Sequence, residues 1–282
     1  MATNNETKSL MDSIITAHGG LTPFTTLHQI QCTFAFHGLA LELKGYGGKT
    51  RHPTITVFPQ NQNPLDPCNP WTITTALGDG DPTDRWLFTP SKVWIENAEG
   101  KVLQERENPR ESFQGHVLTT QWDDLQLCYF LSYAMYNYLT MPWLFTRPGF
   151  GVEEVQDSSS PHVESPHHRQ PWRLLRVTHP PDFPTHTRVQ DFYFGEKDFL
   201  LKSFDYEVDI FGGVAAHYVF DYKRVGGLGV LLPSVRRVVR RVKGTREAVV
   251  GSHTAFWVQY MEVRLVDGEG RVCGDLERVV TE

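Results

Sequence analysis

Residues 122–139 read WDDLQLCYFLSYAMYNYL, and nearly every position of this stretch is apolar or aromatic. We expect a helix here, because Thr120 can cap it and Pro142 ends it. Two acidic residues in the first turn favour the positive end of the helix dipole. A helix that is apolar on all sides is buried. A membrane span is the rival interpretation, but polar side chains interrupt the stretch and favour a helix inside the fold: Asp123, Asp124, Gln126, Ser132 and Asn137.

Runs with a period of two lie on both sides of this helix and predict strands. The longest begins at Ile30, continues to Leu43 and should bend at Gly38. Further runs cover 54–58, 71–77, 85–89, 92–96, 101–107, 172–178, 187–194, 199–208, 214–222, 235–242 and 254–266. Repeated hairpins imply antiparallel pairing, and so many strands do not stay in a flat sheet. The pattern predicts a mainly β fold, a curved antiparallel sheet of half-barrel or lipocalin-like form wrapped around the aromatic helix.

A short amphipathic helix should open the fold. Residues 9–17 place their apolar side chains on one face, and Gly19-Gly20 follows where a left-handed cap is needed. We expect one domain over residues 1–282, since β barrels often reach this length as a single unit. The segment 156–171 has four serines, three histidines and no periodicity, so it is predicted to be a mobile surface loop within that domain.

The charge balance and the N-terminus exclude some classes of partner and location. The chain has 27 Lys and Arg against 33 Asp and Glu, a net charge of −6, so nucleic acid is not an expected partner. The first residues have no basic start and no apolar core, which predicts a cytoplasmic location. The sequence does not indicate an oligomeric state.

No residue pattern typical of a cofactor or a metal site is found. The cysteines Cys32, Cys68, Cys128 and Cys273 are far apart, which favours reduced thiols over a zinc site or disulfides. No glycine-rich loop opens a helix onto a phosphate, and no G-x-S-x-G elbow is present. Adjacent histidines in 156–171 diverge on a loop, so neither a metal nor a cofactor is predicted.

Several segments resemble the lipoprotein-carrier (LolA-like) superfamily. At the start these are Ala17-His18-Gly19-Gly20, Leu27 and the strand from Ile30 to Gly38. The middle is similar to uncharacterised proteins of that fold in Pro109-Arg110-Glu111-Ser112-Phe113, Gly115-His116, Trp122-Asp123, Tyr129-Phe130, Tyr133-Ala134, Tyr138, Thr185-His186, Asp205-Tyr206, Ala215-Ala216-His217 and Pro233-Ser234-Val235-Arg236-Arg237. The resemblance implies an unclosed barrel around an apolar cavity. At the level of fold alone it also suggests cofactor-free biosynthetic cyclases.

The residues that could form a site are aromatic and bear hydroxyl groups. Tyr133 and Tyr206 are the candidate catalytic residues, with His217 as a proton donor. We expect the wall of an apolar chamber that binds substrate from Trp86, Trp94, Tyr129, Tyr136 and Tyr218. The blander alternative is that these aromatics only fill the core.

The strand patterns also predict which side chains face inward. Tyr206 should face the chamber together with Tyr218, which would place His217 outside. Paired arginines, Arg236-Arg237 and Arg240-Arg241, put charge on both faces of one strand. We interpret this strand as a charged sheet edge, although one arginine of each pair could point inward.

Two functions fit such a chamber. The first is a cofactor-independent cyclase or isomerase, for example a pericyclase of the Diels–Alder type, acting on an apolar polyketide or terpenoid intermediate. The second is a non-catalytic carrier of a lipid or hydrophobic metabolite. Whether the protein is an enzyme stays open at this point. Either way the expected partner is a hydrophobic small molecule, and both functions need a cavity that the ligand can enter.

Overall fold

The computed structural model describes residues 5–61, 66, 69–156, 172–245, 249 and 253–276. Its strands form one antiparallel sheet in the order β6-β5-β4-β3-β2-β1-β13-β12-β11-β10-β9-β8-β7, and β14 pairs with the C-terminal part of β13. The strands are β1 (Leu27–His37), β2 (Thr54–Val57), β3 (Thr72–Thr75), β4 (Arg85–Thr89), β5 (Lys92–Glu96), β6 (Val102–Glu107), β7 (Gly151–Val155), β8 (Trp172–Thr178), β9 (Val189–Gly195), β10 (Leu201–Val208), β11 (Gly213–Val225), β12 (Val230–Arg240), β13 (Phe256–Asp267) and β14 (Val272–Leu276).

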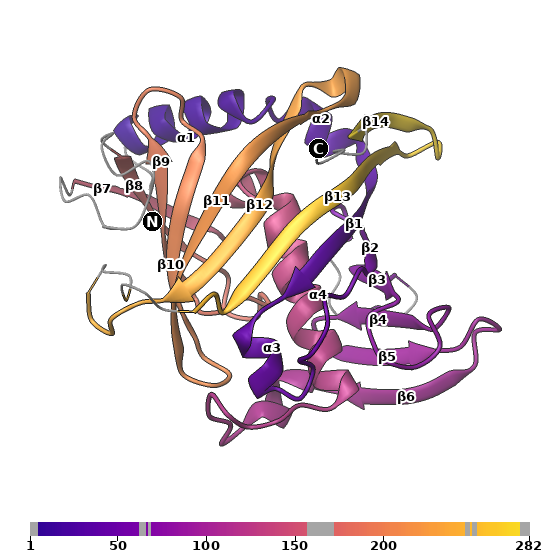
Figure 1. The fold of residues 1–282 in the computed structure, drawn as a ribbon. Coiled ribbons are helices and arrows are strands. Elements are labelled where there is room, and N and C mark those ends of the chain that lie inside the picture. The colour runs from indigo at the N-terminus through magenta and orange to yellow at the C-terminus, as the bar shows by residue number, and fades with distance from the viewer. Residues whose placement is uncertain are drawn as a thin grey trace.

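Helices lie on the concave side of this sheet and at its ends. Figure 1 shows α4 passing behind β13 and α1 lying across the ends of the strands at the top of the view. The helices are α1 (Asn5–Ala17), α2 (Thr22–Thr26), α3 (Leu39–Leu43) and α4 (Asp124–Thr140), with short 3-10 turns η1 (Pro109–Phe113), η2 (Trp143–Thr146) and η3 (Gly226–Leu228). The predicted fold class, a curved antiparallel sheet around a buried aromatic helix with a short N-terminal helix, is confirmed.

The helix α4 is buried along its whole length, from Leu125 to Thr140. Its N-cap is Asp123 rather than the predicted Thr120, whose hydroxyl instead accepts a hydrogen bond from the backbone of Val117. The Asp123 carboxylate accepts from the Gln126 backbone N–H at 2.9 Å, and the Gln126 side chain accepts from the Asp123 N–H at 3.1 Å. This capping box pairs two backbone N–H groups that have no partner within the helix.

The first long strand ends earlier than its sequence predicts. After Gly38 the residues Leu39–Leu43 form the short helix α3 instead of continuing the strand. A Cβ atom on Gly38 would lie 2.2 Å from the carbonyl oxygen of Ala255, so only glycine allows the chain to turn against β13 here. Leu, Ala and Glu are also strong helix formers, and this local preference won over the alternation of apolar residues.

The structure has two strands that were not predicted from the sequence, β7 and β14. Neither shows a clear alternation of apolar and polar residues. Apart from Gln156, the segment predicted as a mobile loop lies outside the described residues. Within the described part of the chain, no helix is both long and apolar enough to cross a membrane.

Removing the cap of α4 should destabilise the whole fold. Asp123→Ala loses the capping box and a two-bond ion pair with Arg106, whose shorter N–O distance is 2.7 Å. We expect the free energy of unfolding to fall by about 1–2 kcal/mol, measured by urea denaturation. Glu99→Ala, in an exposed turn, is the matched control and should change stability by less than about 0.5 kcal/mol. Equal stability of the two variants would show that the cap does not stabilise α4.

Candidate functional site

The three predicted catalytic residues all lie on the inner side of the sheet or on α4. Tyr133 is on α4, Tyr206 on β10 and His217 on β11, and each is at most 4% exposed. His217 pairs with Phe204 across the two strands and stacks on its ring at 4.2 Å. The prediction that His217 faces outward was therefore wrong, and this error brings the three candidates closer together than expected.

Two of the predicted wall residues lie on the opposite, convex face. Trp94 alternates with the core residues Val93 and Ile95, and its indole N–H donates to Glu96 at 2.8 Å. Tyr218 packs in a separate small cluster with Ala216, Val239 and Phe220. These two predictions were wrong, because a period of two defines two faces without saying which one is inside.

The backbone of β11 is irregular at Asp221, which has a positive φ of 53°. The register with β12 passes from the pair Phe220–Val235 to the pair Tyr222–Pro233 without a shift, so no residue is inserted. Tyr222 packs against the core on the same side as His217, although an even number of residues lies between them. A regular strand would place these two side chains on opposite faces.

The inner polar groups form a chain of alternating tyrosine and histidine side chains. Tyr133 Oη lies 3.0 Å from His186 Nδ1, and His186 Nε2 lies 3.0 Å from Tyr138 Oη. The hydroxyls of Tyr138 and Tyr206 lie close enough to shift each other's pKa. Tyr206 Oη in turn lies 3.5 Å from His217 Nδ1. We call these five residues the Tyr–His chain.

His186 holds the centre of the Tyr–His chain. It lies in the loop between β8 and β9, and its ring stacks on Tyr206 with centroids 4.2 Å apart and planes within 7°. The same loop is tied to the rest of the core, since Asn137 donates to the Pro184 carbonyl at 3.0 Å and Arg110 to the Thr185 carbonyl at 3.0 Å. We call residues 179–188 the plug loop, because it closes the concave side over α4.

All members of the Tyr–His chain are neutral near pH 7. Burial lowers the pKa of His186 to about 3, with the Arg110 cation adding to the shift. Burial also raises the pKa of Tyr138 to about 12 and holds those of Tyr133 and Tyr206 well above their ordinary value. The chain can hand protons along its hydrogen bonds but holds no ionised acid or base.

The remaining predicted wall residues are inside the fold but outside the Tyr–His chain. Tyr129 has its ring 5.2 Å from that of Tyr133 and its hydroxyl 3.5 Å from Arg110. Tyr136 lies against Trp71 and accepts a hydrogen bond from Arg147 at 2.9 Å. Trp86 belongs to the same core and packs against Gly78.

The structure contains no open chamber at the predicted tyrosines. Tyr133 and Tyr136 are 0% exposed and Tyr129 is 1% exposed, so no void that admits water touches them beyond that trace. In this conformation the tyrosines expected to line a chamber pack among other buried side chains instead.

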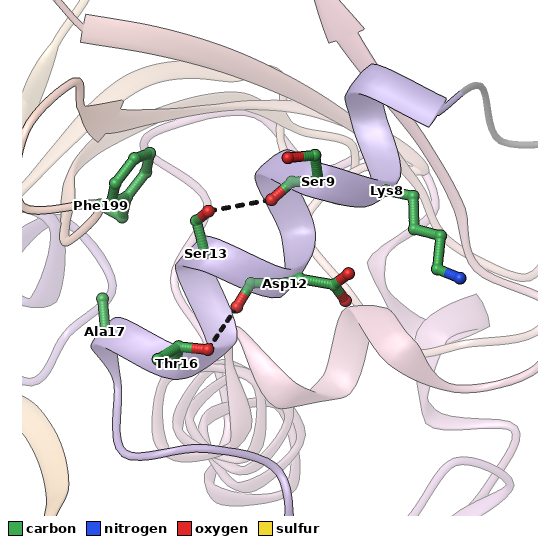
Figure 2. A pocket seen from close by; sticks show the side chains of 7 residues that line it. All are labelled: Lys8, Ser9, Asp12, Ser13, Thr16, Ala17 and Phe199. Carbon is green, nitrogen blue, oxygen red and sulfur yellow. Dashed lines mark hydrogen bonds between the residues drawn. The ribbon is translucent and has the colours of Figure 1, made fainter.

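The depressions described here lie at the surface and are polar. One of about 710 Å³ follows the outer face of α1 and is shown in Figure 2. Its hydroxyl groups bond to carbonyls of their own helix, Ser13 to Ser9 and Thr16 to Asp12. Another of about 370 Å³ borders Tyr206, but most of its lining is charged: Arg176, Asp191, Asp205, Glu207, Asp209 and Arg241. Neither is suited to an apolar ligand.

The described residues hold three free thiols and no set of metal ligands. Cys32 and Cys128 are buried and Cys273 is half-buried, while Cys68 lies outside the described residues. Burial raises the pKa of the Cys128 thiol to about 12, which makes it inert as a nucleophile. In the part of the chain that the structure covers, no three His, Cys, Asp or Glu side chains gather as metal ligands would.

The comparisons with known proteins agree with this architecture. A putative outer membrane lipoprotein-sorting protein domain from Vibrio parahaemolyticus superposes with a TM-score of 0.51 at 8% identity, over 93% of each chain. A DUF1329 family protein from Desulfovibrio piger gives 0.54 at 12% identity, over 94% of this chain and 95% of that one. The chain has a LolA-like fold. The resemblance read from the sequence is confirmed at the level of fold.

Other comparisons add little to this result. A LolA superfamily protein from Nitrosomonas europaea superposes with a TM-score of 0.49 at 9% identity, over 95% of each chain. No protein-family model matches the sequence, and no curated protein does so either. The LolA-like fold therefore stands on structure alone, and the suggested relation to cyclases stays a hypothesis.

Sequence reasoning missed His186, Tyr138 and Arg110 as site residues. His186 follows a proline-rich turn, where no periodicity indicates burial. Tyr138 was read as part of the buried helix without a role. The many tyrosines on α4 could have predicted that polar residues of other elements enter the core, since each buried hydroxyl needs a hydrogen-bond partner.

Acid should destabilise the fold through His186. Its folded pKa of about 3 lies below the ordinary 6.5, so the unfolded chain takes up the proton first. The free energy of unfolding should therefore fall as the pH drops from about 6.5 toward 3. In His186→Gln this slope should be shallower by about 1 kcal/mol per pH unit, although the variant is less stable at pH 7.

Urea denaturation between about pH 7 and pH 4.5 measures these slopes. The exposed His52 provides the control, because His52→Gln should keep the slope of the wild type. Identical slopes for wild type and His186→Gln would mean that His186 is already charged in the folded protein.

Proposed function

We propose that the protein binds a hydrophobic small molecule or lipid as a carrier, in the space between α4 and the strands β9–β13. One observation carries this proposal. The backbone of α4 lies closest to β2–β6, whereas long side chains such as Tyr138, Tyr206 and Arg236 span the distance to the other half of the sheet. Rotation of a few of these side chains would create a cavity without breaking any strand pairing. The LolA-like fold supports the same view.

Displacement of the plug loop provides the way in. The plug loop is held against α4 and η1 by its hydrogen bonds with Asn137 and Arg110. The two ring nitrogens of His186 add contacts to the hydroxyls of Tyr133 and Tyr138. Each such bond contributes only about 1 kcal/mol net, because water replaces it when the loop opens. An alkyl chain that enters gains roughly 25 cal/mol for each Å² of apolar surface that it buries. Binding can therefore offset the cost of opening.

Among the residues that the structure describes, no contact favours the cyclase hypothesis over the carrier. A catalytic Tyr133 would have to donate to a substrate carbonyl, but its hydroxyl bonds to His186. A neutral Tyr–His chain is suited to holding the plug loop closed. Measured turnover of a substrate would distinguish an enzyme from a carrier. Replacing single tyrosines by phenylalanine would then identify the hydroxyl groups that take part in the reaction.

Binding is tested with delipidated protein and the neutral fluorescent probe N-phenyl-1-naphthylamine. We expect saturable binding by the wild type and tighter apparent binding by Asn137→Ala, which releases the plug loop from α4. Loss of about 1 kcal/mol of closure raises the open fraction roughly fivefold. Thr140→Ala is the control, because it removes a bond within α4 and leaves the plug loop attached. No saturable binding by the wild type would contradict the carrier proposal.

Tyr133→Phe and Tyr206→Phe separate a carrier from an enzyme. Both changes remove only a hydroxyl, so a carrier should retain probe affinity within a few-fold. A cyclase acting on an apolar polyketide or terpenoid intermediate should instead lose about ten- to a thousandfold in rate at unchanged affinity. Product formation is followed by chromatography against the uncatalysed background. Wild-type turnover above that background would replace the carrier by the enzyme.

A further inference from the structure

A buried arginine that pairs with no carboxylate of the described residues lies in the same space. Arg236 is 1% exposed and points into the concave side, between Val219 of β11 and Val258 of β13. Its strand is interior to the sheet, so the interpretation of this strand as a charged edge was wrong. The neighbouring Arg237 faces the other way and bonds to Thr254 at 3.0 Å.

The guanidinium of Arg236 is only partly satisfied. Its Nε donates to Tyr260 Oη and its Nη2 to the Tyr138 carbonyl, both at 2.9 Å, while Nη1 has no partner among the described residues. The rings of Tyr138 and Tyr260 offer their faces to the cation at 4.8 and 5.6 Å. These contacts reduce the cost of the buried charge but do not neutralise it.

The interior offers no acid to pair with this charge. Of the described residues, Asp205 is the one buried acid, and it lies on the convex face next to Tyr193 and Arg241. A buried and unpaired cation costs several kcal/mol, which hydrophobic side chains of similar size would avoid. A ligand that carries an anionic group would pair with this charge and offset its cost.

His217 provides a second N–H without an acceptor. Among the described residues, the acceptor within hydrogen-bond distance of the Tyr206 hydroxyl is His217 Nδ1, at 3.5 Å. A buried hydroxyl needs an acceptor for its proton, so Tyr206 donates to Nδ1. His217 then carries its own proton on Nε2, which has no partner in this part of the chain.

The two open donors lie beside the same ring. The centroid of the His217 ring lies 4.8 Å from that of Tyr138, and the Arg236 guanidinium carbon lies 4.8 Å from the Tyr138 centroid. We infer that Arg236 and His217 bind the carboxylate of an amphiphile whose alkyl chain occupies the space between α4 and β9–β13. One carboxylate oxygen accepts from Arg236 Nη1 and the other from His217 Nε2. This inference rests on the proposed carrier function and names its ligand class.

Dodecanoate, dodecan-1-ol and acetate test the head group, each as a competitor of the bound naphthylamine probe at about pH 8. We expect the acid to bind at least about tenfold more tightly than the alcohol, since a charge-assisted bond in a dry site is worth more than 1.4 kcal/mol. Acetate should not compete, because it lacks the alkyl chain that contributes the burial energy.

Arg236→Met removes the cation and keeps the volume of the side chain. It should abolish the preference for the acid while dodecan-1-ol binds within about threefold of wild type. Its melting temperature without ligand should be no lower than that of the wild type, because an unpaired buried charge is removed. Arg237→Met, one residue away on the opposite face, should keep the full preference.

Each outcome decides between the two proposals. Equal affinity of the wild type for acid and alcohol overturns the head-group site and leaves the carrier function intact, and this comparison needs no variant. A preference that survives in Arg236→Met, or competition by acetate as strong as by dodecanoate, also overturns it. If the probe and both long-chain ligands fail to bind, the carrier proposal and this inference fall together.

Discussion

The complete burial of α4 is the constraint on which the rest of the structure depends. A helix with aromatic side chains on every side needs apolar neighbours on every side, and a flat sheet covers only one of them. The sheet therefore curves around α4, and the plug loop and the short helices cover what remains. The capping box at Asp123 completes one end of α4, because it pairs two backbone N–H groups that have no partner within the helix.

Because α4 carries tyrosines where a buried helix could carry leucines, it brings hydroxyl groups into the interior. Each buried hydroxyl must find a partner in a dry environment, so the chain requires histidine and arginine from other elements. Tyr133 and Tyr138 meet such a partner in His186 of the plug loop, and Tyr206 meets one in His217 of β11. Tyr129 accepts from Arg110 of the 3-10 turn η1. The polar network thus links the two halves of the sheet through α4.

Much of the fold could be predicted from the sequence, and the reasons for the failures are physical. The central helix and most strands were found because alternation and apolar periodicity are local signals. The prediction of a strand over Leu39–Leu43 was wrong, because the chain turns at Gly38, where the backbone lies close to Ala255. The alternation of apolar residues continues past this turn and gave no sign of it. Of the predicted site, Tyr133, Tyr206 and His217 do come together. Trp94 and Tyr218 do not, because the side of the sheet that faces α4 is decided by packing between distant strands.

The irregular backbone at Asp221 lets one strand turn side chains of opposite parity toward the interior. Ala215, His217 and Val219 face α4 upstream of it, and Tyr222 packs against the core downstream. Since the register with β12 is the same on both sides, the backbone angle of Asp221 makes this change without an added residue. Among homologous chains, this position should therefore be held by residues that tolerate the left-handed region, such as glycine, asparagine or aspartate.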